Sequence, residues 1–180
     1  MEKFGKSQPV TRREDVRFLT GEGRYVDDIA PANALQAFVF RSPVAHGVIT
    51  ALDVTAARGA EGVQAVYTYA DLEAAGIKTT IDATRVKNRD GSQGAETVRQ
   101  VLAKDRVRFV GEPLALVVAD TLAQARDAAE LIDFDYDPLP AKLDLAASGE
   151  TLHPGAPDNV AYDWGMGDEA ATAAAFDAAA

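Results

Sequence analysis

The fold is decided by residues 107–119, which read Val107-Arg108-Phe109-Val110-Gly111-Glu112-Pro113-Leu114-Ala115-Leu116-Val117-Val118-Ala119. Residues 107–110 predict a strand and Gly111-Glu112-Pro113 a turn. Residues 114–119 predict a second strand, because this apolar run is too short for a helix. Since both faces of the second strand are apolar, we expect it to lie in the centre of a sheet and to be covered on both sides.

A helix and a third strand follow directly. Thr121-Leu122-Ala123-Gln124 is a capping box that predicts a helix ending near Leu131. One stripe of this helix is apolar and is made of Leu122, Ala125, Ala129 and Ile132. Residues 133–137 then alternate acidic and aromatic side chains, which predicts a strand with one wet face, ended by Pro138 and Pro140.

The upstream half contains shorter signals. Apolar runs predict strands over residues 35–40, 48–54 and 63–67, and a short turn or helix lies around residues 56–58. The sequence Thr68-Tyr69-Ala70-Asp71 matches a capping box, which predicts a helix over 69–75 that ends before Gly76. Residues 78–97 predict a long surface loop, and the first thirty residues are loop-like. These elements together predict a mixed α+β fold.

The C-terminal end is alanine-rich. Residues 168–180 predict a helix in which Phe176 is the one large apolar residue, with neither a C-cap nor an apolar face. Such a helix looks interrupted, so we expect the chain to be a piece of a larger one. An isolated piece exposes former interface, and we expect it to self-associate or to have a loosely held tail after about Pro157.

Composition excludes several classes of protein. The chain has 180 residues, a mass of 19.1 kDa and no cysteine, so thiolate metal sites, iron–sulfur ligation and disulfides are excluded. With only His46 and His153, a histidine-rich metal site is not expected. The net charge of −10 disfavours nucleic acid, and the nearest cationic group is Arg85, Lys87 and Arg89 in an exposed loop. Neither a membrane span nor a signal peptide is visible, which favours a cytoplasmic protein.

Four motifs could carry chemistry. Gly165-Met166-Gly167-Asp168-Glu169-Ala170 has the glycine spacing of a dinucleotide fingerprint, but no firm strand precedes it and its acidic pair would meet the phosphates. Asp133-Phe134-Asp135-Tyr136-Asp137 resembles the start of a calcium loop, but Pro138 and Asp144 replace the required glycine and glutamate. The glycine motif is better explained as a turn, and residues 133–137 are better explained as the solvent-exposed face of a strand.

The other two motifs are catalytic candidates. Ser42 and His46 are too close in an extended segment to meet as nucleophile and base, so we expect His46 to bond to backbone in a turn. Glu112 in the turn could act as a general acid, but it has no second titratable group nearby in the sequence. Residue by residue, no part of the chain amounts to an active site.

Several blocks together resemble the large, molybdenum-cofactor chain of the xanthine dehydrogenase/aldehyde oxidase family. Within that family the resemblance is greatest to aerobic carbon monoxide dehydrogenase large chains. It covers nearly all of residues 8–178, and the blocks keep their order. The blocks are Arg17–Ile29, Arg41–His46 with Ile49 and Asp53, Gly62–Val66 with Asp71 and Leu72, and Val107–Ala119 continuing to Ala141.

The resemblance implies an α/β hammerhead domain over residues 31–147. An extended segment (1–30) would precede it, and a linker with the start of a molybdopterin-binding domain (148–180) would follow. It implies a molybdenum–molybdopterin cofactor of the cytosine dinucleotide type held by later domains, with iron–sulfur clusters and FAD on partner subunits. No catalytic, cofactor-binding or metal-binding residue of the family maps onto residues 1–180, so the segment itself is expected to be inactive.

Two alternatives remain open from the sequence. The chain could be a free-standing binding or assembly module with the same fold. It could also be a small acid–base hydrolase built on Glu112 and the aspartates.

Overall fold

The computed structural model describes residues 12–81, 85–145, 147 and 149–179. The chain divides into two compact units, Met1–Ala34 and Leu35–Ala180. In the first unit, helix α1 (Asp15–Leu19) and the 3-10 turn η1 (Val26–Asp28) occupy a region whose sequence predicts loop. These turns form because short polar side chains close them: the Asp28 carboxylate accepts the Tyr25 N–H at 2.9 Å and the Thr20 hydroxyl donates to Val16 O at 3.0 Å.

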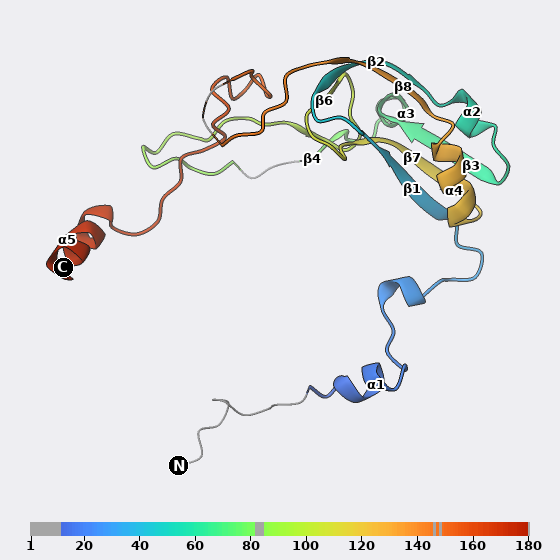
Figure 1. Cartoon of the computed structure of the whole chain (residues 1–180), viewed down its shortest axis with the longest axis horizontal. Helices are drawn as coiled ribbons and strands as arrows, with labels where there is room; N and C mark the ends of the chain where they lie inside the picture. The colour runs from blue at the N-terminus through green and yellow to red at the C-terminus, as the bar shows by residue number, and fades with distance from the viewer. Residues whose placement is uncertain (1–11, 82–84, 146, 148, 180) are drawn as a thin grey trace. The chain divides into compact units, whose positions relative to one another are not determined.

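The second unit is built on a three-stranded antiparallel sheet with the order β1–β7–β3 (Figure 1). Its strands are β1 (Gln36–Arg41), β7 (Pro113–Ala119) and β3 (Val63–Thr68). The predicted central place of residues 114–119 is confirmed. Leu114, Ala115, Val117 and Ala119 are each 0% exposed, whereas Leu116 and Val118 are half-buried, so one face is covered more completely than the other.

Helix α4 (Leu122–Ala129) packs against β1 and β7 (Figure 1). The Thr121 hydroxyl accepts the Gln124 N–H at 3.2 Å, as the capping box predicts. Ala125, Ala128 and Ala129 are buried, and their small side chains let the helix backbone approach the sheet. The predicted stripe is wrong at its first member, because Leu122 is 38% exposed and the buried stripe begins one turn later.

A second antiparallel sheet has the order β6–β2–β8. Its strands are β6 (Arg106–Val107), β2 (Gly47–Asp53) and β8 (Asp133–Pro138). Phe40 of the first sheet and Phe134 of the second meet edge to face, with ring centroids 6.4 Å apart. The predicted strand over 107–110 is too long: β6 ends at Val107, and the bond from Glu112 N–H to Phe109 O at 3.2 Å closes a turn over residues 109–112.

Five further elements complete the described part of the unit: α2 (Thr55–Arg58), α3 (Tyr69–Ala74), the paired strands β4 (Thr80–Ile81) and β5 (Arg99–Gln100), and α5 (Glu169–Ala179). The predicted loop over 78–97 is wrong at its start, because β4 finds its partner strand about twenty positions along the chain. Within it, Lys87 and Gln93 form a bridge around a turn. No helix among the described residues is long and apolar enough to cross a membrane. The mixed α+β class is confirmed.

Candidate functional site

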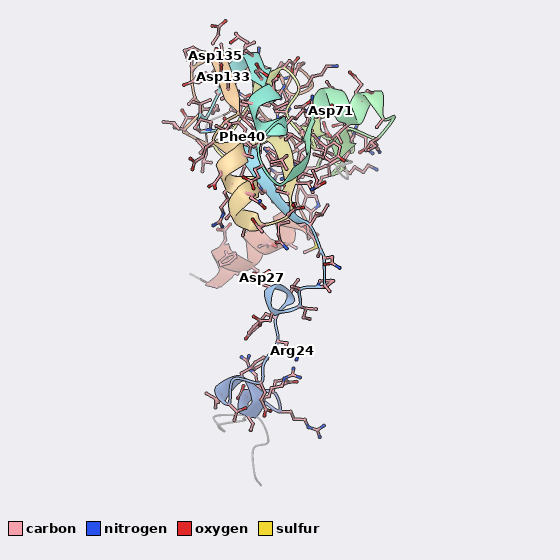
Figure 2. The ribbon with its side chains drawn as sticks, turned by 90° about the vertical axis from the view of Figure 1, so that its right-hand side faces the viewer. Arg24, Asp27, Phe40, Asp71, Asp133 and Asp135 are labelled. Atoms are coloured by element: carbon pink, nitrogen blue, oxygen red, sulfur yellow. The ribbon has the colours of Figure 1, made fainter. Side chains whose placement is uncertain are left out.

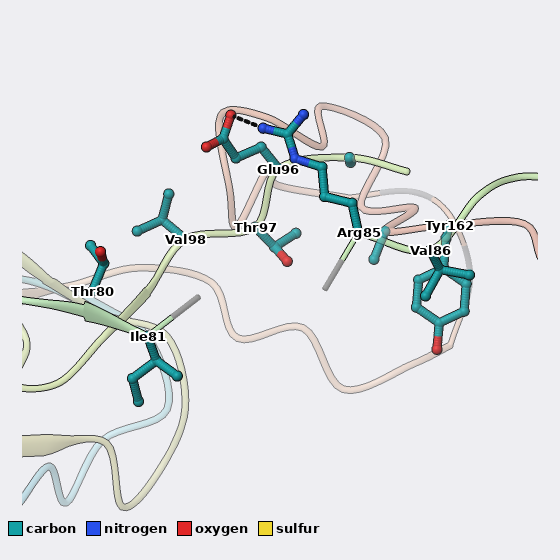
Figure 3. A pocket seen from close by; sticks show the side chains of 10 residues that line it. Thr80, Ile81, Arg85, Val86, Glu96, Thr97, Val98 and Tyr162 are labelled. Carbon is teal, nitrogen blue, oxygen red and sulfur yellow. Dashed lines mark ion pairs between the residues drawn. The ribbon is translucent and has the colours of Figure 1, made fainter. Parts of the chain in front are cut away.

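The group of cations at Arg85 and Arg89 is neutralised by carboxylates. Arg85 pairs with Glu96 at 2.6 Å, beside a hollow of about 460 Å³ that is also lined by Thr80 and Tyr162 (Figure 3). Arg89 pairs with Asp163 at 2.8 Å, and the hydrogen bond that the guanidinium donates to this carboxylate raises the pKa of Arg89. Two of the three cations in this segment are therefore paired with carboxylates, which weakens the positive surface that a nucleic acid requires.

The glycine motif Gly165–Ala170 leads into α5, but the Asp168 carboxylate already occupies the helix N-terminus where a phosphate would bind. Gly167 has a φ of +96°, which marks a turn, and the Asp168 carboxylate accepts the Ala171 N–H at 2.9 Å. A phosphate on a helix N-terminus needs these free amide donors and the absence of a like charge. The motif is thus an acidic helix cap.

Ser42 and His46 do not meet. The Ser42 hydroxyl donates to Val44 O at 2.8 Å and accepts the Val44 N–H at 3.1 Å. His46 is 3% exposed, with Nδ1 at 2.8 Å from Pro140 O and a buried Nε2 that has no hydrogen-bond partner among the described residues. His46 therefore joins the start of β2 to the chain beyond β8, in agreement with a backbone-bonded histidine.

The acidic residues of β8 lie on the exposed side of an edge strand. Asp133, Asp135 and Asp137 are all exposed, and the first two point away from the body of the sheet (Figure 2). In the described part of the chain, no three His, Asp or Glu side chains are grouped so as to hold a metal ion. Such charges on an edge strand disfavour pairing with another chain.

Glu112 is 5% exposed, and its Oε2 accepts the backbone N–H of Arg108 at 2.5 Å. The turn that it closes contains Gly111 with a φ of +87°. Gly111 N–H donates to Ser42 O at 2.8 Å, and Ser42 N–H donates to Glu112 O at 2.9 Å. The carboxylate thus fixes a turn that is bonded to the end of β1.

Tertiary structure brings Arg108 and His153 together, a pair that sequence reasoning missed. A hollow of about 390 Å³, here called the Arg108 pocket, is lined by Thr97, Arg99, Arg108, Phe109, Glu112 and His153. The Arg108 guanidinium donates through Nε to Leu152 O at 2.9 Å, which holds the loop that carries His153. Burial and, to a lesser degree, the charge of Arg108 lower the pKa of His153, so its neutral form is favoured. No local sequence pattern connects these residues.

The fold and these contacts can be compared with known proteins. The sequence profile of the family described as "Aldehyde oxidase and xanthine dehydrogenase, a/b hammerhead domain" matches residues 20–140. The chain belongs to this family. The matched range contains β1 to β8, and so the hammerhead resemblance seen in the sequence is confirmed.

Relatives of this hammerhead domain are large subunits of oxidoreductases. The nicotine 6-hydroxylase large subunit of Paenarthrobacter nicotinovorans is 41% identical over 163 residues, which are 87% of this chain and 19% of that protein. The carbon monoxide dehydrogenase large chain of Hydrogenophaga pseudoflava is 35% identical over 91% of this chain and 21% of its own. The hammerhead chain therefore spans about one fifth of the length of the curated relatives it matches.

Solved structures give the same result. Quinoline 2-oxidoreductase from Pseudomonas putida 86 superposes with a TM-score of 0.65 and 41% identity, over 73% of this chain and 16% of that one. Reconstituted CO dehydrogenase from Oligotropha carboxidovorans superposes with a TM-score of 0.68 and 32% identity, over 93% of this chain and 22% of that one.

Proposed function

We propose that this chain is the N-terminal structural domain of the large subunit of a molybdenum-dependent hydroxylase. The observation that carries the proposal is the family match over residues 20–140, together with relatives that are named as large subunits and are about five times longer than the matched part. In this proposal residues 1–30 are an N-terminal segment, 31–147 are the hammerhead domain and 148–180 lead into the next domain.

The residues of this chain do not fit the cofactor of such an enzyme. Among the described residues no carboxylate or histidine group is arranged to hold a metal, and the amide end of α5 is occupied by Asp168. We therefore assign no step of the reaction to this chain. The molybdopterin cofactor, of the cytosine dinucleotide type, would be bound by later domains, and iron–sulfur and flavin subunits would be the partners in a cytoplasmic complex.

The test uses the protein from its own cell. An affinity tag is placed at the N-terminus of the chromosomal gene, and the purified product is measured for intact mass, molybdenum, cytidine nucleotide released by acid, and dye reduction. The matched comparator is the 180-residue chain expressed alone.

We expect molybdenum and nucleotide in the native preparation and neither in the chain alone. A native product of 180 residues without molybdenum would contradict the proposal and favour a free-standing binding module. Turnover by the isolated chain would contradict the structural role.

A further inference from the structure

The Arg108 pocket has the parts of a small anion site. The Arg108 guanidinium is oriented by two backbone acceptors, Leu152 O at 2.9 Å and Arg106 O at 3.4 Å. These bonds use Nε and Nη1, and within the described residues Nη2 has no partner. A guanidinium fixed in this way has lost its freedom before a ligand arrives, so less entropy is lost on binding.

A second guanidinium lines the same hollow. The side chain of Arg99, on β5, makes no hydrogen bond or ion pair with any described residue, although its backbone lies in the β4–β5 ladder. Several other cationic side chains of this acidic chain form ion pairs with carboxylates, among them Arg58, Arg85, Arg89 and Lys104. Arg99 and Arg108 thus bring two positive charges to a hollow of about 390 Å³, a volume suited to a small molecule.

The remaining walls restrict the ligand. Glu112 contributes one negative charge, so the pocket carries a net charge of about +1, which a single carboxylate neutralises. Val98 and Phe109, both exposed, offer apolar surface, while the Thr97 hydroxyl and the His153 ring offer polar groups. A planar carboxylate matches the geometry of a guanidinium fork.

We propose that the Arg108 pocket binds a monocarboxylate with an apolar body, the carboxylate lying against Arg99 and Arg108 and the body against Val98 and Phe109. The carboxylate belongs either to a small organic acid or to an acidic side chain of a partner polypeptide. This site is independent of the proposed function, because it depends only on residues of this chain.

Protonation of His153 links the site to pH. The charged groups that line the hollows around His153 are Glu96, Arg99, Arg108 and Glu112. Burial and, to a lesser degree, the charge of Arg108 lower the pKa of His153, and a bound carboxylate offsets part of that charge and so favours the protonated ring. By linkage, the carboxylate binds more tightly as the pH falls through the pKa of His153.

The experiment is a titration of the full 180-residue chain followed by NMR of the His153 ring and the amides of residues 97–109. The probes are benzoate, its neutral counterpart benzamide, inorganic phosphate, and a capped Ala-Glu-Ala peptide. We expect saturable shifts with benzoate or with the peptide, and none with benzamide. A preference for benzoate assigns a small acid, and a preference for the peptide assigns a partner side chain.

Variants test whether the carboxylate binds in the Arg108 pocket. Arg99→Gln should weaken binding by about tenfold or more, as expected for loss of a charge-assisted hydrogen bond, and Arg99→Lys should weaken it less. Arg126→Gln makes the same chemical change on α4 and should bind as the wild type does. Unchanged binding in Arg99→Gln, or equal shifts with benzamide and benzoate, would overturn the proposal. Circular dichroism of each variant verifies that it is folded.

Discussion

Glu112 and Arg108 are joined by a 2.5 Å hydrogen bond from the Arg108 backbone N–H to the Glu112 Oε2, inside a turn where the carboxylate is 5% exposed. The bond links the first residue after β6 to the residue that directly precedes β7. Removing the acceptor leaves a donor without a partner in a part-buried turn, and this costs free energy.

Glu112→Ala should therefore lower the free energy of unfolding by about 1–3 kcal/mol. Glu112→Gln keeps an acceptor oxygen and should cost less. Urea unfolding of the two variants measures both values. Equal losses would show that the hydrogen bond is not what stabilises the turn.

Asp71 should make stability depend on pH in the acid range. Its carboxylate accepts the Thr68 N–H and hydroxyl, each at 2.7 Å, and pairs with Arg58 at 2.8 Å. Burial alone raises the pKa of Asp71, but these bonds together with the charge of Arg58 lower it. Because the pKa is lower in the folded state, the ionised carboxylate stabilises the fold at pH values above the unfolded-state pKa of about 3.9. This stabilisation is lost as the pH falls through the folded-state pKa.

Asp71→Ala should cost about 1 kcal/mol at pH 7, the usual value for a lost helix cap. The difference from wild type should shrink as the pH is lowered toward 3, because the stabilising effect of the ionised carboxylate decreases below the unfolded pKa of about 3.9. Urea unfolding at both values measures this change. A difference that does not vary with pH would contradict the assignment.

Two glycines form a matched pair. Gly111 has a φ of +87° with no atom near its would-be Cβ, so Gly111→Ala is penalised by backbone conformation alone, by about 1–2 kcal/mol. Gly59 ends α2 with a φ of −87° and only ordinary contacts, so Gly59→Ala should be neutral or stabilising by up to about 1 kcal/mol. Thermal unfolding of both variants should give shifts of opposite sign or, at the least, a clear loss in Gly111→Ala alone.

Two leucines test where the core lies. Leu114 is 0% exposed and packs with Val107 and Ala103, so Leu114→Ala should lower the free energy of unfolding by about 2–5 kcal/mol. Leu131 is 50% exposed, and the same truncation there should cost less than about 1 kcal/mol. Comparable losses from chemical denaturation would mean that Leu114, Val107 and Ala103 do not form a packed core.

His153 should destabilise the protein below neutral pH. Burial and the charge of Arg108 lower the pKa of His153 in the folded state. Between this folded-state pKa and the unfolded-state pKa of about 6.5, the unfolded chain binds more protons than the folded one, so acid favours unfolding. Wild type should therefore lose stability between pH 7.5 and 5.5 relative to His153→Gln, which cannot titrate. Parallel pH dependence of the two proteins would show that His153 is not perturbed.

The elements that could be predicted are those whose determinants are close in the chain. The Thr68–Asp71 and Thr121–Gln124 contacts each join residues three positions apart, so they are visible as motifs. The central strand was predictable because apolar residues on both of its faces need cover on both sides.

The polar contacts between residues far apart in the sequence could not be predicted in the same way. Arg89 and Asp163 are separated by 74 positions, and His46 and Pro140 by 94. In each pair, the distance in space between the two residues depends on the path of the whole chain. The β4–β5 pairing was missed for the same reason, since neither two-residue strand shows a period by itself.

By itself the sequence determined the class of the fold, the β7–α4–β8 order and the family resemblance, because local periodicity, caps and motif order are properties of neighbouring residues. Only the tertiary structure decided that Glu112 closes a turn, that His46 bonds to Pro140, and that Arg99, Arg108 and His153 line one hollow. The physical reason is that hydrogen bonds and charges act over a few ångströms in space, whatever the number of residues between their partners.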